Sequence, residues 1–168
     1  MRSFDHGGAS TSAAGERTAA TRPVAPCPDG DPTSVVAVVV AYDRRTLLRE
    51  CLQALRRQST SPTAVLVVDN ASSDGTAEML RTEFPEVVLL QLQRNTGGAG
   101  GFAVGIAAAV DQLEADAVWV MDDDTVPTEG ALAELLAARA AAPAGTELLA
   151  SRVLWTDGRD HPMNTPRM

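Results

Sequence analysis

Short aliphatic runs alternate with longer segments of helical period along most of this 168-residue chain. Strands that are apolar on both faces, with a helix between successive strands, are typical of a parallel sheet covered by helices on both sides. The aliphatic runs predict strands over residues 35–41, 64–69, 87–92, 117–121 and 148–154. The intervening segments predict helices over residues 46–58, 76–84, 100–113 and 128–142. The sequence therefore predicts an α/β fold, with a Rossmann-like, mostly parallel sheet.

The first 34 residues differ from the rest in composition. Gly, Ala, Ser, Thr and Pro dominate there, and Phe4 and Val24 are the only large apolar residues after the initiator methionine. Because such a segment buries too little apolar surface to offset its chain entropy, residues 1–34 are predicted to be a disordered tail and residues 35–168 one domain. No aliphatic run approaches the roughly 20 residues that span a bilayer, and the N-terminus lacks the apolar core of a signal sequence.

Charge and cysteine content narrow the classes of function. The chain has 14 Lys and Arg residues against 22 Asp and Glu residues, a formal net charge of -8, and every one of its cations is arginine. An acidic chain lacks the basic face that nucleic acid requires, so we expect no nucleic-acid partner. Without lysine, the chain fits neither a P-loop nor a phosphoacceptor signalling module. Cys27 and Cys51 are too few for a disulfide framework, which indicates a cytoplasmic protein, and Cys51 is expected in the core.

Polar clusters follow four of the predicted strands. They are Tyr42-Asp43-Arg44, the segment 69–76, the segment 94–101 and Asp122-Asp123-Asp124. Any one of them could be ordinary turn chemistry. In an open parallel sheet, however, the carboxyl ends of the strands meet at one edge, where ligands bind. The four clusters together predict a binding site at that edge.

The three adjacent aspartates suggest a metal site. In extended backbone alternate side chains share a face, so Asp122 and Asp124 are predicted to point together while Asp123 turns away. Two carboxylates on one side suit Mg²⁺ or Mn²⁺, which complete their coordination with phosphate oxygens and water. The alternative is an acidic cap for the helix that is predicted to begin near Thr128.

Four glycines lie between the third strand and the helix that follows it. Gly97, Gly98, Gly100 and Gly101 would let backbone N–H groups approach a phosphate or a ribose. Their spacing and their position after the third strand do not match the dinucleotide fingerprint, which follows a first strand. A dinucleotide site is therefore disfavoured.

These motifs, in this order and spacing, resemble family 2 glycosyltransferases with the GT-A fold. The resemblance extends from Val35 to about Leu154, and the glycine-rich stretch followed by Asp122-Asp123-Asp124 is most similar to galactofuranosyltransferases and bacterial rhamnosyltransferase-like enzymes. It implies a nucleotide-sugar donor, most simply UDP-linked, and a glycan or lipid-linked acceptor in the cell envelope. It also implies metal-assisted, inverting transfer. Peripheral association with the inner face of the cell membrane is compatible with the resemblance.

The resemblance also implies roles for individual residues. Tyr42 would lie against the base, and Asp69 would accept a hydrogen bond from the base or the ribose. Asp122 and Asp124 would match the Asp-x-Asp motif and hold Mn²⁺ or Mg²⁺. The other expected donor contacts are Arg94, Asn95, Gly97, Gly98, Gly100, Gly101, Asp122 and Asp123.

The catalytic base is not identified by these motifs. In the family it follows the Asp-x-Asp motif at some distance, so we expect it beyond Met168 and interpret this chain as the donor-binding part of a longer domain. Asp157, Asp160 and His161 are interpreted as turn and loop residues. The alternative is a catalytically inactive module that binds the nucleotide-sugar without transferring it.

Overall fold

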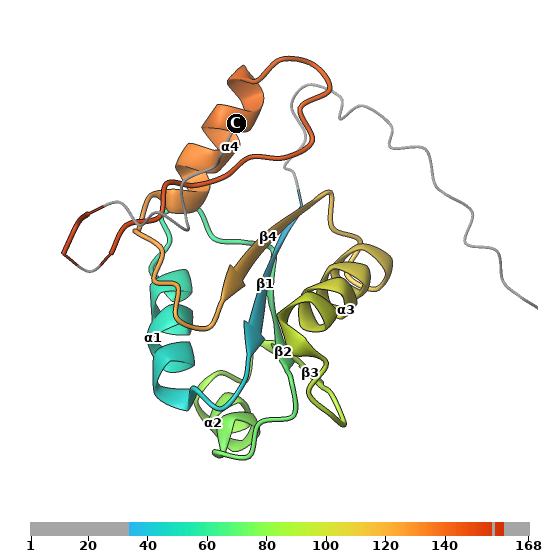
Figure 1. Cartoon of the computed structure of the whole chain (residues 1–168). Helices are drawn as coiled ribbons and strands as arrows, with labels where there is room; N and C mark the ends of the chain where they lie inside the picture. Colours follow the sequence, from blue (N-terminus) through green and yellow to red (C-terminus); the bar gives the residue numbers. More distant parts are fainter. Residues whose placement is uncertain (1–33, 156, 160–168) are drawn as a thin grey trace, which may run out of the picture. The chain divides into compact units, whose positions relative to one another are not determined.

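The computed structural model describes residues 34–155 and 157–159. The predicted tail lies outside this part except for Ser34, as do Asp160 and His161. Strands and helices alternate strictly along the described chain (Figure 1). The elements are β1 (Val35–Ala41), α1 (Arg45–Arg56), β2 (Ala64–Asp69), α2 (Thr76–Glu83), β3 (Val88–Gln91), α3 (Gly97–Asp111), β4 (Ala117–Asp122) and α4 (Ala131–Ala141).

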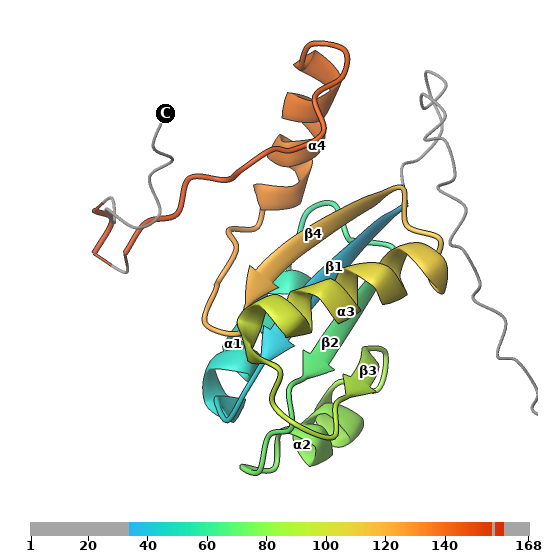
Figure 2. The same cartoon turned by 45° about the vertical axis from the view of Figure 1, so that its right-hand side comes forward.

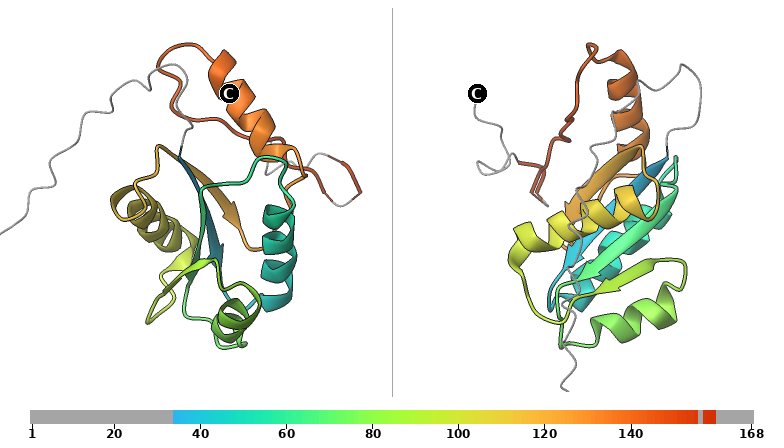
Figure 3. Two further views of the ribbon diagram at one scale, coloured as in Figure 1. Left: turned by 180° about the vertical axis from the view of Figure 1, so that it is seen from behind. Right: turned by 90° about the vertical axis from the view of Figure 1, so that its right-hand side faces the viewer.

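The four strands form one parallel sheet in the order β3-β2-β1-β4. All seven residues of β1 are buried, because this strand has a neighbour on each side and helices over both faces. Helices α1 and α2 cover one face and α3 covers the other (Figures 1 and 3). The predicted α/β fold is therefore confirmed, and the continuous aliphatic runs are explained by burial from both sides.

Alternate residues of β1 supply two separate cores. Ala37, Val39 and Ala41 pack with the apolar side chains of α1 and α2, whereas Val36, Val38 and Val40 pack toward α3. The two sets follow from the period of two residues in a strand. Together they fix which face of the sheet each later side chain occupies.

Helix α3 begins at Gly97, three residues before the predicted start at Gly100. The glycine run is therefore the first turn of a helix and not a loop that precedes one. Glycine has poor helix propensity, so sequence rules place it outside the helix. Packing overrides that preference here: a Cβ on Gly101 would lie 2.7 Å from Val40 Cγ1, and one on Gly105 would lie 2.6 Å from Val38 Cγ1. Only glycine lets α3 approach β1 this closely.

The predicted strand over residues 148–154 is wrong. The segment is irregular apart from an isolated bridge at Leu154, and the Leu148 side chain is 91% exposed. A strand needs a hydrogen-bonded neighbour, and in the described part of the chain no further strand pairs with the outer edge of β4. Apolar composition alone therefore did not produce a strand. Among residues 34–155 and 157–159, no helix has the length and apolar character that crossing a bilayer requires.

The segment that follows β4 is tied back to the end of α1. The buried Gln58 amide donates from Nε2 to the Thr128 carbonyl at 2.6 Å and accepts the Leu132 N–H through Oε1 at 3.1 Å. The Ser59 N–H also donates to the Glu129 carbonyl at 2.7 Å. These bonds fix the segment around Thr128, where the sequence predicts the start of the helix. Helix α4 begins three residues later, at Ala131.

Cys51 is buried on α1, with its Sγ 3.9 Å from Met121 Sδ, as expected for a core residue. Burial, together with the charges of Asp123 and Asp124, raises the pKa of its thiol to about 12. The native thiol should therefore resist iodoacetamide at pH 8, because the thiolate is the reactive species. Labelling a Cys27→Ser variant with and without urea, followed by mass spectrometry, checks this. Rapid labelling of the native protein would contradict the burial.

Candidate functional site

The carboxyl ends of β1, β2 and β4 meet at one edge of the sheet. The last paired residues are Ala41 with Asp69 on one side and Val40 with Asp122 on the other. In Figure 2 these three arrowheads point toward the same end of the sheet, where α3 also begins. The convergence of the polar clusters that the sequence predicts is therefore observed. We refer to this region, built from residues 42–45, 69–76, 94–98 and 122–124, as the strand-end site.

Asp122 ends β4, Asp123 and Asp124 form the turn that follows, and the three side chains alternate in exposure. Asp122 and Asp124 are exposed, whereas Asp123 is buried and accepts the Tyr42 backbone N–H at 3.1 Å. Burial, followed by repulsion from Asp124, raises the pKa of Asp122 above its ordinary value. Burial also raises the pKa of Asp123, although the Tyr42 N–H and the Arg44 charge oppose that rise. Asp123 thus supports the β1–α1 loop, and Asp122 and Asp124 face solvent.

Arg44 reaches this acidic group from the β1–α1 loop. Its Nη1 lies 2.8 Å from Asp124 Oδ2 and 3.5 Å from Asp123 Oδ1. The sequence prediction assigned no role to Arg44, because the spacing along the chain says nothing of a pairing across 80 positions. The guanidinium partly neutralises carboxylates that would otherwise repel one another.

The loops after β1 and β2 hold each other through acidic side chains. Asp43, at a φ of 50°, accepts the Ser73 N–H at 2.6 Å, and its own N–H donates to Ser72 Oγ at 3.1 Å. Asp74 accepts the N–H of Arg45 at 2.8 Å and both the N–H and the hydroxyl of Thr76. Partial burial opposes ionisation of Asp74, but these hydrogen bonds outweigh it and lower its pKa. The Ser73-Asp74-Gly75-Thr76 motif therefore holds the loops after β1 and β2 together at the strand-end site.

Asn70 joins the end of β2 to the start of α3. Its Nδ2 donates to Asn95 Oδ1 and to the Gly97 carbonyl, each at 3.1 Å. Its Oδ1 accepts the Thr96 N–H at 2.9 Å and the Thr96 hydroxyl at 3.2 Å. Asn95 Oδ1 also accepts the Gly97 N–H at 2.7 Å. The buried Asn70 amide thus fixes the glycine-rich turn, a role that the sequence motifs do not indicate.

Asp69 is fully buried beneath the β2–α2 loop. Its Oδ1 accepts the Ser72 N–H at 2.9 Å, but its Oδ2 has no hydrogen-bond partner within the described part of the chain. A buried acceptor without a donor is costly, so such an atom in a binding region is a candidate partner for a ligand.

The remaining predicted contacts differ in how open they are. Tyr42 is 46% exposed, and Arg94 and Asn95 are also exposed. A Cβ on Gly97 or Gly98 would meet nothing within 4 Å, so a ligand can approach the backbone there. By contrast, Gly100 lies against Thr96 and Gly101 lies against Val40. Of the four glycines, Gly97 and Gly98 are therefore the two that a ligand can approach.

Comparison with known proteins identifies the family. The model of "Glycosyl transferase family 2" matches residues 36–152. The chain belongs to glycosyl transferase family 2. Galactofuranosyltransferase GlfT1 of Mycolicibacterium smegmatis is 40% identical over 95 residues, which are 56% of this chain and 31% of that protein. GlfT1 of Mycobacterium tuberculosis is 40% identical over 93 residues, 54% of this chain and 30% of that protein.

The fold is shared with a solved structure as well. Residues 1–349 of S. aureus TarS in complex with UDP align with a TM-score of 0.53 and 23% identity, covering 62% of this chain and 31% of the other. This likeness supports the predicted GT-A fold. The chain matches about a third of the length of each of these three proteins.

The side chains of Asp122, Asp123 and Asp124, which we call the acidic edge, provide the oxygen ligands that a divalent cation needs. Asp122 and Asp124 offer exposed carboxylate oxygens, and Asp124 already pairs with the positive charge of Arg44 at 2.8 Å. Within residues 34–155 and 157–159, no three His, Cys, Asp or Glu side chains are grouped to hold a metal by themselves. Mg²⁺ and Mn²⁺ commonly use one or two carboxylates together with substrate phosphates. The residues therefore fit a metal that a bound diphosphate completes.

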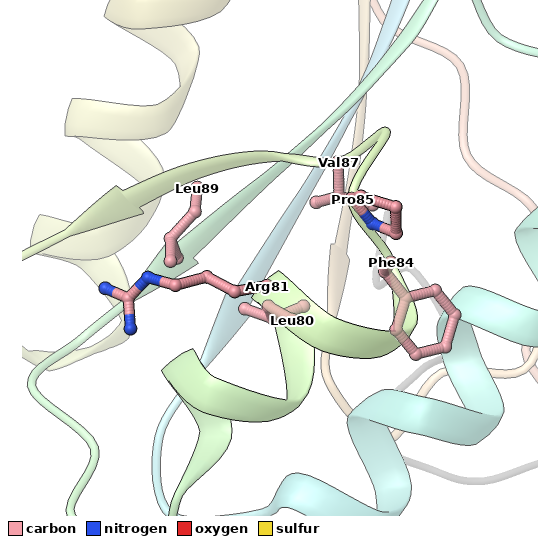
Figure 4. Close-up of a pocket in the computed structure, with 6 residues that line it drawn as sticks. All are labelled: Leu80, Arg81, Phe84, Pro85, Val87 and Leu89. Atoms are coloured by element: carbon pink, nitrogen blue, oxygen red, sulfur yellow. The ribbon is translucent and has the colours of Figure 1, made fainter.

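Two other features lie outside the strand-end site. A small apolar pocket between α2 and β3 is lined by Leu80, Arg81, Phe84, Pro85, Val87 and Leu89 (Figure 4). It shares no residue with the predicted contacts. Asp157 forms a local turn in which it pairs with Arg159 at 2.8 Å, in agreement with its interpretation as turn chemistry.

Proposed function

We propose that this domain binds a nucleoside-diphosphate sugar at the strand-end site and serves a glycosyltransferase of family 2. The observation that carries the proposal is that exposed carboxylates, those of Asp122 and Asp124, follow the end of one central strand, while α3 begins with open backbone at Gly97 and Gly98. Carboxylates suit a cation, and the free backbone at a helix N-terminus suits phosphate or ribose oxygens. A nucleotide diphosphate needs both kinds of partner.

The donor contacts follow the position of each residue. Tyr42 would stack on the base, because its ring is half exposed at the end of β1. Asp69 Oδ2 would accept a hydrogen bond from the base or the ribose, which supplies the partner it lacks. The remaining donor contacts are proposed for Arg94, Asn95, Gly97, Gly98, Asp122 and Asp123, with Gly100 and Gly101 supporting the turn through packing.

Mn²⁺ or Mg²⁺ would be held by Asp122 and Asp124. When bound, the metal would neutralise the negative charge that develops on the departing nucleoside diphosphate. The protein's own contribution would be to leave the Asp122 and Asp124 carboxylates exposed while Asp123 is buried and accepts the Tyr42 N–H.

The substrates are proposed from the relatives. Two proteins that are 40% identical over the matched residues are named galactofuranosyltransferases, so galactofuranose is the first sugar to test and rhamnose the second. We propose a UDP-linked donor, inverting transfer to a cell-envelope glycan or lipid-linked acceptor, and work at the inner face of the membrane. Inverting transfer needs a base beside the acceptor hydroxyl, and no residue of this chain is assigned to it.

Calorimetric titration of the full chain with UDP tests donor binding. UDP should bind more tightly with Mn²⁺ than with EDTA, and Asp124→Asn should erase that difference because it removes a metal ligand. Asp111→Asn is the matched control, since it removes the same charge from an exposed position at the far end of α3. Equal affinity for UDP with and without metal would refute the metal assignment, and no binding in either condition would refute the donor site.

A further inference from the structure

The Arg44 side chain stands where a divalent cation would act. Its Nη1 contacts Asp124 Oδ2 at 2.8 Å, and Asp123 Oδ1 lies 3.5 Å away. Asp124 is one of the two carboxylates that the proposed function assigns to the metal. One oxygen of that carboxylate is thus already engaged by a positive charge that belongs to the chain.

The backbone of Arg44 is fixed by hydrogen bonds, whereas its paired side chain is exposed to solvent. The Arg44 carbonyl accepts the Leu48 N–H at 3.0 Å in the first turn of α1, and the next residue, Arg45, is held by Asp74. The Arg44 side chain, in contrast, is 53% exposed, and the Asp124 side chain is 50% exposed. Exposed ion pairs contribute little net free energy, so the guanidinium can leave Asp124 without large cost.

We propose that Arg44 is a resident counter-cation of the acidic edge, which a divalent cation displaces from Asp124 when it binds. The inference rests on the proposed function for the identity of the metal ligands, but it concerns the chain without nucleotide. Arg44 offsets the mutual repulsion of three adjacent carboxylates in the free protein. The metal must therefore compete with a charge of the same sign for the same oxygen.

Competition predicts that removing the guanidinium strengthens metal binding. Titration of the full chain with Mn²⁺ alone, followed by the electron paramagnetic resonance signal of the free ion, measures this directly. Arg44→Met should bind Mn²⁺ about two- to fivefold more tightly than the unmodified chain, the range that loss of an exposed ion pair allows. Arg44→Lys keeps the competing charge and should stay near the unmodified value.

Arg57→Met is the matched control for net charge. It removes one exposed cation at the opposite end of α1, so it should leave Mn²⁺ affinity nearly unchanged. Unchanged or weaker Mn²⁺ binding by Arg44→Met would overturn the inference, as would an equal gain in Arg57→Met. A parallel UDP titration of the unmodified chain separates the two proposals. Absence of UDP binding would count against the donor site alone, whereas UDP binding with no effect of Arg44→Met would count against the counter-cation alone.

Discussion

Replacing Gly105 with valine is expected to destabilise the folded domain by about 2–3 kcal/mol, because the added atoms overfill a packed core. A Cβ at this position would lie 2.6 Å from Val38 Cγ1 and 2.9 Å from Val68 Cγ2. Both neighbours are fully buried, β-branched and stiff, so they cannot turn aside. The helix must move away from the sheet instead. Urea denaturation followed by circular dichroism gives the change in free energy of unfolding.

The control for Gly105 lies in the first turn of the same helix. A Cβ on Gly98 would have no neighbour within 4 Å, so Gly98→Ala should keep the packing and gain helix propensity, about 0.5–1 kcal/mol at most. Opposite signs for the two substitutions would show that closeness to β1 is what selects glycine in α3. A Gly105→Val variant as stable as the unmodified chain would mean that the helix does not sit this close to the sheet.

The strands were predictable wherever burial on both faces dictated their composition. β1 and β2 begin and end at the predicted residues because each has neighbours on both sides. The segment 148–154 is also largely aliphatic, yet it forms no strand because strand formation depends on a pairing partner and not on composition alone. The start of α3 was misplaced for a related reason. Helix propensity disfavours glycine within a helix, whereas the close approach of Gly101 and Gly105 to the sheet is a tertiary effect.

The meeting of the polar clusters at one edge of the sheet was predictable from topology, and so was the burial of Asp123 between two exposed aspartates. What the sequence did not indicate is how the side chains pair. Arg44 and Asp124 are separated by 80 positions, and Asn70 lies 25 to 27 positions before the groups it contacts. Such contacts depend on loop conformations, including the positive φ of Asp43, that follow from no local rule. Motifs located the site, and only the fold shows what holds it together.

Asn70→Ala is expected to weaken UDP binding about tenfold or more, and to lower the free energy of unfolding by about 1–3 kcal/mol. The buried Asn70 amide makes four hydrogen bonds to Asn95, Thr96 and Gly97. Without it, the first turn of α3 loses its attachment to β2, and the backbone at Gly97 and Gly98 is no longer held in place for a diphosphate. Calorimetry with UDP and Mn²⁺, together with urea denaturation, measures both effects.

A double-mutant cycle separates positioning from a merely local loss of stability. Asn95 Oδ1 receives hydrogen bonds from Asn70 and from Gly97, so Asn70 and Asn95 act on the same turn. If they work as one network, Asn70→Ala combined with Asn95→Ala should cost less UDP affinity than the sum of the single substitutions. Additive losses would indicate that Asn95 contacts the nucleotide on its own account. Asn70→Asp tests the donor side of this network. It keeps an acceptor for the Thr96 N–H but places a carboxylate oxygen against the Gly97 carbonyl and Asn95 Oδ1, so its UDP affinity should fall at least as far as that of Asn70→Ala.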